Sequence, residues 1–149
     1  MPGNAYGIAL PSSGPHVVSA GADVTLTAGT ETTFFTEAAG APNQGNYQYI
    51  VWLNLWVSFG ASAPTALVFA AKIGAGSDFD SVTVDPASLV ASTHVQYNFM
   101  LFSPESSTNY VGAGSTINIT GLATTNNATL LHLYSRGIRL IYRVNDSYA

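Results

Sequence analysis

The side chains that could perform chemistry are few and widely separated along the chain. The three histidines, His16, His94 and His132, stand alone, and no H-E-x-x-H or other paired spacing occurs. No G-x-S-x-G sequence marks a nucleophile, although strands can bring a distant Ser, His and Asp together. The chain has no cysteine, so disulfides and thiolate metal ligands are excluded. We therefore expect no catalytic centre, no cofactor and no enzymatic activity.

Asp78 and Asp80 form a D-x-D sequence. On a strand, alternate carboxylates share a face and could hold a hard cation, but Ca²⁺ takes about six to eight oxygen ligands and no others are evident. We expect instead two solvated carboxylates that flank a core Phe79, and no metal site. The run Gly74–Ser77 is similar to a phosphate loop, but a strand and not a helix follows it, so we assign it no ligand.

The stretch that must position the other elements runs over Tyr47–Phe59. At the two-residue period of a strand, its odd positions are apolar or aromatic throughout, whereas its even positions include Ile50, Trp52, Asn54 and Trp56. An antiparallel sheet needs only one buried face. This strand therefore lies either at the centre of a closed sandwich or with its second face covered by something outside the chain.

Trp52 and Trp56 lie on the same face of this strand, roughly 13 Å apart at about 3.3 Å per residue. They fit three interpretations: core residues, a subunit interface, in which Trp is enriched at binding hot spots, or a sugar-stacking platform with Asn54 between them. The third would make the protein a lectin-like module that binds a glycan. We include Trp52, Asn54 and Trp56 in the candidate subunit interface.

Three of the four basic residues gather near the end of the chain: Arg136, Arg139 and Arg143. The last two alternate with apolar residues in Gly137–Asn145, so one face of this strand is basic. They either keep an exposed strand face soluble and protect a sheet edge from unwanted pairing, or they bind acidic residues of a partner subunit, since Arg forms bidentate contacts with carboxylates.

Short strands separated by turns fill the chain from His16 onward. No amphipathic helix of useful length and no internal repeat accompanies them, which is typical of a single-domain β-sandwich or barrel. The predicted strands are Val17–Val18, Val24–Thr27, Thr32–Thr36, Tyr47–Phe59, Thr65–Ile73, Asp78–Val84, His94–Phe102, Ser115–Thr120, Thr129–Ser135 and Gly137–Asn145, with one helical turn after Asp85 that reaches Leu89 and Val90.

Residues 1–15 are predicted to form an extended N-terminal arm, and residues 16–149 the sandwich. The arm contains three prolines, which fix φ and cannot donate to a strand ladder. It is either a frayed terminus or a segment that lies along a neighbouring subunit and uses Tyr6, Ile8 and Leu10 as anchors.

The composition favours assembly with other protein subunits. Only 8% of the residues are charged and the formal net charge is −4, against roughly 25% charged residues in an ordinary soluble domain. A nearly neutral surface repels its own copies weakly. Nucleic acid needs a basic footprint and is excluded as a partner, and a membrane surface is disfavoured for the same reason. The N-terminus lacks the features of a signal peptide, and we expect a soluble protein.

Several segments together resemble small jelly-roll proteins of bacteriophage virions. They are the Thr- and Ala-rich run Val24–Thr36, the long aromatic strand, the alanine-rich strand that ends in Lys72-Ile73, the segment Tyr97–Phe99 and the closing GIRLIYRV at Gly137–Val144. Head-decoration (cement) proteins and related surface proteins with a tumour-necrosis-factor-like roll share this layout. The resemblance covers residues 16–145.

This resemblance implies an all-β jelly roll of two antiparallel four-stranded sheets. It also implies a homotrimer that clamps the major capsid protein of the same virion from outside, on the capsid surface, after assembly in the host cytoplasm. It could also imply a small single-jelly-roll major capsid protein or a tail-tip module. The family supplies no catalytic residues. The alternatives from other classes are the carbohydrate-binding module and a secreted hydrolase subunit.

Overall fold

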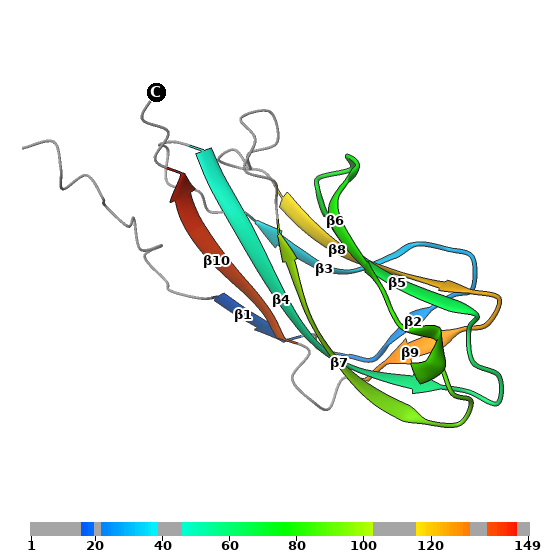
Figure 1. Ribbon diagram of the computed structural model, residues 1–149. Coiled ribbons are helices and arrows are strands. Elements are labelled where there is room, and N and C mark those ends of the chain that lie inside the picture. The colour runs from blue at the N-terminus through cyan, green and yellow to red at the C-terminus, as the bar shows by residue number, and fades with distance from the viewer. Residues whose placement is uncertain (1–15, 20–21, 39–45, 103–115, 132–136, 146–149) are drawn as a thin grey trace, which may run out of the picture.

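The computed structural model describes residues 16–19, 22–38, 46–102, 116–131 and 137–145, and of these 16–19, 37–38, 46–52 and 137–145 are described by their backbone alone. Within these ranges the chain is built almost entirely of strands (Figure 1). No helix there is long and apolar enough to span a membrane. The elements are β1 His16–Ser19, β2 Val24–Leu26, β3 Thr32–Ala38, β4 Asn46–Phe59, β5 Ala66–Ile73, β6 Asp78–Thr83, the 3₁₀ helix η2 Pro86–Ser88, β7 His94–Phe102, β8 Thr116–Thr124, β9 Ala128–Leu130 and β10 Gly137–Asn145.

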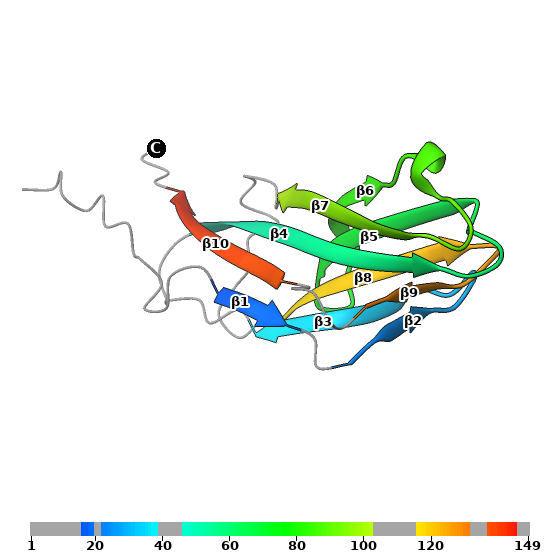
Figure 2. The ribbon, with the colours of Figure 1, turned by 90° about the horizontal axis from the view of Figure 1, so that it is seen from below.

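The strands form two antiparallel sheets that pack face to face. In the first sheet, the order is β1-β10-β4-β9-β2, and β7 pairs with the other edge of β4. The 14-residue β4 spans this sheet, because β10 pairs with Asn46–Asn54 and β9 pairs with Val57–Phe59. Figure 2 shows β10 and β1 at one end of β4, and β9 and β2 at the other. The second sheet has the order β3-β8-β5-β6.

The strand pairs are nested, as in one long hairpin that has been rolled up. β5 pairs with β6, β4 with β7, β3 with β8, and the first strands β1 and β2 with the last strands β10 and β9. This is the jelly-roll topology, in which closure of two sheets over one core protects most of the apolar surface. The predicted all-β jelly-roll sandwich is confirmed. The N-terminal arm, and with it the boundary after residue 15, lies outside the described residues and stays a prediction.

The core lies between the sheets and follows the predicted alternation. The odd positions Leu53, Leu55 and Val57 of β4 are fully buried. From the second sheet, Phe69 of β5 packs edge-on against Phe34 at a ring distance of 6.0 Å. Side chains that alternate in this way bury one face of each sheet and leave the other face for solvent or partners.

Several predicted strand ends differ from the observed ones by one or two residues, and the ends of β8 and β9 differ by more; a glycine accounts for the difference in β8. β8 does not end at Thr120 but continues through Gly121 to Thr124. Glycine in a strand often marks a close backbone approach, and a Cβ at this position would lie 2.8 Å from Cδ1 of Leu26 on the opposite sheet. β9 begins one residue earlier than predicted and ends at Leu130, and residues 132–136 lie outside the described part.

The predicted helical turn is present as η2, and it is shorter than expected. Asp85 accepts a hydrogen bond from the N–H of Ala87 at 2.9 Å, which is the usual action of a capping carboxylate. The hydroxyls of Ser88 and Tyr97 lie 2.9 Å apart and form a hydrogen bond that fastens η2 to β7. Burial raises the pKa of the Tyr97 phenol above 10.0, while the Ser88 hydrogen bond opposes this rise.

Candidate functional site

The outer face of the first sheet is the surface that the sequence places at an interface, and β7 forms one side of it. The strand alternates strictly: Tyr97 and Leu101 are buried, whereas its even-numbered side chains are exposed. Two of the exposed side chains are large and apolar, Met100 at 54% exposure and Phe102 at 45%. Exposed apolar side chains that adjoin one another indicate an interaction surface more often than scattered ones do.

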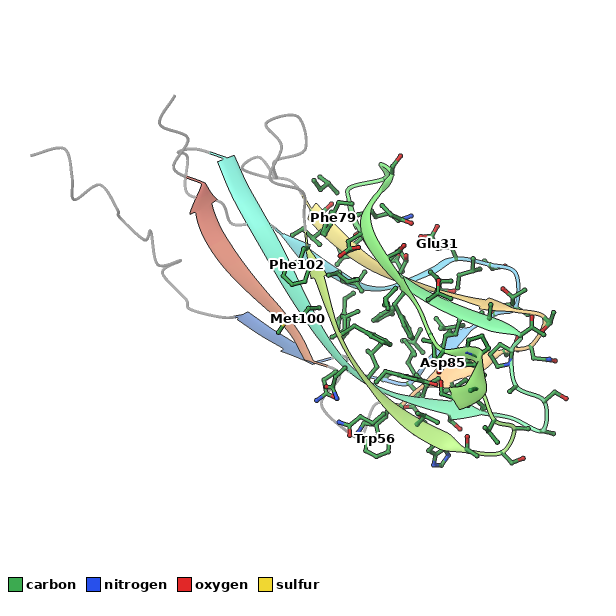
Figure 3. The ribbon with its side chains drawn as sticks, viewed as in Figure 1. Glu31, Trp56, Phe79, Asp85, Met100 and Phe102 are labelled. Carbon is green, nitrogen blue, oxygen red and sulfur yellow. The ribbon has the colours of Figure 1, made fainter. Side chains whose placement is uncertain are left out.

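Strand register places the candidate tryptophans at β4 positions that pair with the exposed positions of β7. Met100 pairs with Trp52, and Gln96 pairs with Trp56, along the β4–β7 ladder. The indole of Trp56 is only half-buried, and Figure 3 shows it toward the opposite end of β7 from Met100 and Phe102. We call the set Asn54, Trp56, Gln96, Met100 and Phe102 the outer face of the first sheet.

Asn54 lies in this face and is already hydrogen-bonded. Its Oδ1 accepts from Nε2 of Gln96 at 2.9 Å, which ties β4 to β7. The contact with Gln96 uses one lone pair of the Asn54 oxygen and leaves the rest of the amide for other partners. Both the protein interface and the sugar platform therefore stay predictions at this position.

The sequence interpretation missed Met100 and Phe102. Both belong to the polar set of alternating positions in His94–Phe102, which also contains Gln96 and Asn98. The sequence signal that could have identified them is the presence of two large apolar residues among even-numbered positions that are otherwise polar. It becomes informative only when the register with β4 is known.

The remaining candidates are described in part or not at all. For Trp52, Arg139 and Arg143 the backbone is described, and Arg139 pairs in register with Trp52. β10 has strand neighbours on both sides at Arg139, since β1 pairs there as well. Arg139 therefore does not protect a sheet edge, as one interpretation had it.

The other candidate interface residues lie outside the described part of the chain. They are Arg136 and the arm residues Tyr6, Ile8 and Leu10. Their roles remain predictions.

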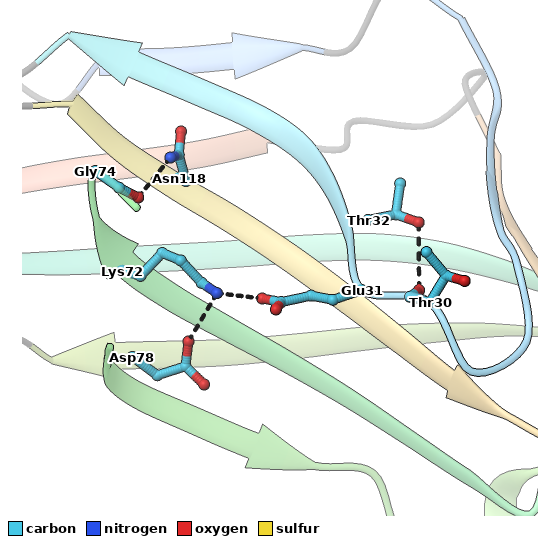
Figure 4. Close-up of polar contacts among 7 residues, drawn as sticks. All are labelled: Thr30, Glu31, Thr32, Lys72, Gly74, Asp78 and Asn118. Carbon is cyan, nitrogen blue, oxygen red and sulfur yellow. Dashed lines mark hydrogen bonds and ion pairs between the residues drawn. The ribbon is translucent and has the colours of Figure 1, made fainter. Parts of the chain in front are cut away.

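The second sheet carries a polar strap across its outer face. Nζ of Lys72 on β5 forms an ion pair with Glu31, which precedes β3, and lies 3.4 Å from Oδ1 of Asp78 on β6. Figure 4 shows this chain of contacts crossing β8. The hydrogen bond from Lys72 is the main reason that the pKa of Glu31 lies below its ordinary 4.5, and a hydrogen bond from Thr120 is the second. The same bond to Glu31 raises the pKa of Lys72 above 10.5. The strap covers Thr120, which is only 3% exposed.

Asp78 and Asp80 do not form a cation site together. A bulge at Phe79 shifts the register, so that Asp80 pairs with the buried Ala71 while Asp78 pairs with Lys72 on the outer face. Asp80 accepts a hydrogen bond from the N–H of Phe102 at 2.8 Å. Neither carboxylate is simply solvated, which differs from the sequence expectation. Among the described residues there is no cluster of three or more metal-binding side chains.

Neither a protein-family model nor a curated protein matches the sequence. Similar solved structures include infectious bursal disease virus strain Gt (18% identity, 87% of this chain covered, TM-score 0.43) and strain Gx (16%, 89%, 0.45). The VP2 subviral particle of the same virus aligns at 16% identity over 88% of this chain with a TM-score of 0.40. This chain spans 37–38% of the length of those chains. Alignments this distant assign neither a function nor a partner to the chain.

Proposed function

We propose that this protein is a non-enzymatic structural protein of a virion that assembles through the outer face of its first sheet. The observation that carries the proposal is the exposure of Met100 and Phe102 on the same sheet face as the half-buried Trp56. The jelly roll is a fold that viral capsid and lectin domains use. This likeness of fold is an analogy, and the chemistry of the face supports the first of these roles.

The face has the character of a protein interface. Among the described side chains of β4 and β7 there is no carboxylate, ammonium or guanidinium group, and interface centres are depleted in charge and enriched in aromatic residues and Met. Full burial of a Phe or Met side chain is worth about 1.5–3 kcal/mol. Because Met100 and Phe102 are half exposed, covering what remains contributes roughly 1 kcal/mol for each.

Contacts of this size are weak singly and become strong when many copies act together. In a shell, each subunit makes several such contacts, and linked contacts raise the overall binding by orders of magnitude without new interactions. A low charge also reduces repulsion between identical subunits. The face is therefore suited to a repetitive assembly.

The finer assignment that we propose is a trimeric decoration (cement) protein on the outside of a capsid. Its partner would be the major capsid protein, and residues 1–15 would tie each copy to its neighbour. The alternatives within the virion are a small major capsid protein with a single jelly roll and a tail-tip module. Deletion of residues 1–15 distinguishes the role of the arm in assembly from that of the sheet face. Loss of subunit contacts in that variant would support a role for the arm, and unchanged assembly would contradict it.

The test measures the assembly state of the full chain by sedimentation velocity and light scattering. We expect oligomers at micromolar concentration, and we expect the double variant Met100→Ser/Phe102→Ser to dissociate. Val90→Ser is the matched control, because Val90 is also an exposed apolar residue at 50% exposure but lies in the connection after η2. A wild-type monomer, or equal dissociation in the control, would contradict the proposal.

A glycan array distinguishes the lectin alternative. Saccharide binding that is lost on replacement of Trp56 by Ala, in a chain that stays monomeric, would favour a carbohydrate-binding module. Assembly without saccharide binding would favour the structural role.

A further inference from the structure

The backbone of β7 has one side that faces β4 and one side that faces away. In an antiparallel pair each residue directs its N–H and C=O to the same side, and that side alternates along the strand. Two hydrogen bonds fix the alternation here. The C=O of Thr93 accepts from the N–H of Phe59 in β4 at 3.0 Å, and the N–H of Phe102 donates away from β4 to Asp80 at 2.8 Å. Odd-numbered residues therefore face β4.

It follows that Gln96, Asn98 and Met100 direct their backbone groups away from β4. Within the described part of the chain, no hydrogen bond joins these backbone groups to another residue. Their side chains are exposed as well. This row of donors and acceptors is a template for a further strand.

The other three sheet edges are interrupted, and β7 is not. β3 has a register shift next to Phe34, and β6 has one at Phe79. The third edge is divided between β1 and β2, which have 4 and 3 residues. Bulges and short strands are devices that prevent edge pairing. β7 pairs with β4 over 9 residues without a shift, and its sequence HVQYNFMLF contains no proline, lysine or acidic residue.

We propose that β7 pairs antiparallel with β7 of a second copy of this chain, so that the first sheet continues from one subunit into the next. A second copy fits this edge because the strand is neutral apart from His94 and so brings no like charges together across a twofold axis. Asn98 then lies opposite Asn98 of the partner subunit, and Gln96 opposite the partner's Met100. Asp80 already holds the N–H of Phe102, so the pairing ends after Met100.

This inference rests on the proposed function and adds a second contact to it. A twofold edge contact joins copies in pairs, whereas a trimer closes on itself. A subunit that has both kinds of contact can extend into a shell, because each trimer is then linked to its neighbours. The side chains of Met100 and Phe102 lie on the face next to the shared edge, so pairing brings the two apolar faces into one continuous surface.

Site-resolved hydrogen exchange on the full chain tests the edge contact directly. We expect the amides of Gln96, Asn98 and Met100 to exchange at least about tenfold more slowly in concentrated samples than at dilutions where the chain is monomeric. The amide of Phe102 should be protected at both concentrations, because its acceptor belongs to the same subunit. Assembly without added protection of the first three amides would overturn the edge contact and leave the proposed function intact. A chain that is monomeric at all concentrations would overturn both.

Substitution at Asn98 provides the second measurement. Asn98→Pro removes the outward N–H and no bond to β4, and proline is tolerated on edge strands in that orientation. We expect it to weaken the association by at least about tenfold and to abolish the concentration-dependent protection of Gln96 and Met100. Asn98→Thr is the matched control, because it changes the side chain and keeps the N–H, and it should associate as the wild type does. Unchanged association of the Pro variant, or equal loss in the Thr variant, would overturn the proposal.

Discussion

Gly121 lies where a side chain of the first sheet packs directly on the backbone of the second, and its replacement by alanine is the sharpest test of the packing. An added Cβ would lie 2.8 Å from Cδ1 and 3.0 Å from Cδ2 of Leu26, and 3.4 Å from Cε1 of Phe69. Carbon atoms in good contact lie about 3.5–4.0 Å apart, so Leu26 would have to withdraw by roughly 0.7 Å or more. Leu26 is fully buried and β2 is held by its pairing with β9.

The expected cost follows from these distances. Overpacking a close-packed core by a methyl group costs about 1–3 kcal/mol, and the lower entropy of the unfolded chain after Gly→Ala returns about 0.4–1 kcal/mol. The difference between the midpoints of these two ranges is a loss of roughly 1.3 kcal/mol in the free energy of unfolding. For a domain of this size, each kcal/mol lowers Tm by about 2–4 °C.

Urea unfolding followed by circular dichroism measures this change, with a double-mutant cycle to identify its cause. Leu26→Val removes both Cδ atoms, so Gly121→Ala should cost less in that background. Gly60→Ala is the control, because no atom lies within 4 Å of its added Cβ, and its stability should match or slightly exceed the wild type. A Gly121→Ala variant as stable as the wild type, or one whose cost is unchanged by Leu26→Val, would refute the reasoning.

Three further predictions concern the polar contacts. Lys72→Met should lower the free energy of unfolding by about 1 kcal/mol at pH 7, as expected for a partly exposed ion pair, with Lys72→Arg as control. Because the pKa of Glu31 is lowered and that of Lys72 is raised, this difference should shrink below pH 4.5 as Glu31 takes up a proton and above pH 10.5 as Lys72 loses one; a constant difference across the pH range would contradict the ion pair. Thr120→Val should move the pKa of Glu31 upward toward 4.5 in an NMR titration, and an unchanged pKa would show that the hydroxyl has no effect. Asp80→Ala should cost about 1 kcal/mol and accelerate exchange of the Phe102 amide, so continued protection of that amide would place its acceptor elsewhere.

The strands and their buried faces could be predicted because the signal for them is local. In β4, alternate positions are apolar over the whole strand, and the buried Leu53, Leu55 and Val57 are the positions that the two-residue period selects. The sandwich or barrel followed from the number and spacing of such strands, and the jelly roll was what the resemblance implied. Neither inference needed to know which strands are neighbours.

The features that were missed depend on contacts between distant segments. Gly121 does not mark the end of a strand. A glycine is needed there because Leu26, which is far away in the sequence, leaves no room for a side chain. The two-residue period puts Asp78 and Asp80 on one face, but the bulge at Phe79 separates them. Alternation alone cannot reveal a bulge, because it assumes that the register is unbroken.

The two outer faces of the sandwich differ in whether their polar and apolar groups find partners within one subunit, and this difference determines which face can take part in assembly. The second sheet uses Lys72, the only lysine in the chain, to bind Glu31 and Asp78 over Thr120, so these three charges are paired within one subunit. The first sheet has no described charge across β4 and β7. It leaves Met100 exposed and the outward backbone groups of Gln96, Asn98 and Met100 without a partner in the described chain. A neutral, apolar face next to an uninterrupted edge gains from contact with a copy of itself, whereas the strapped face would have to break its own ion pairs to do so.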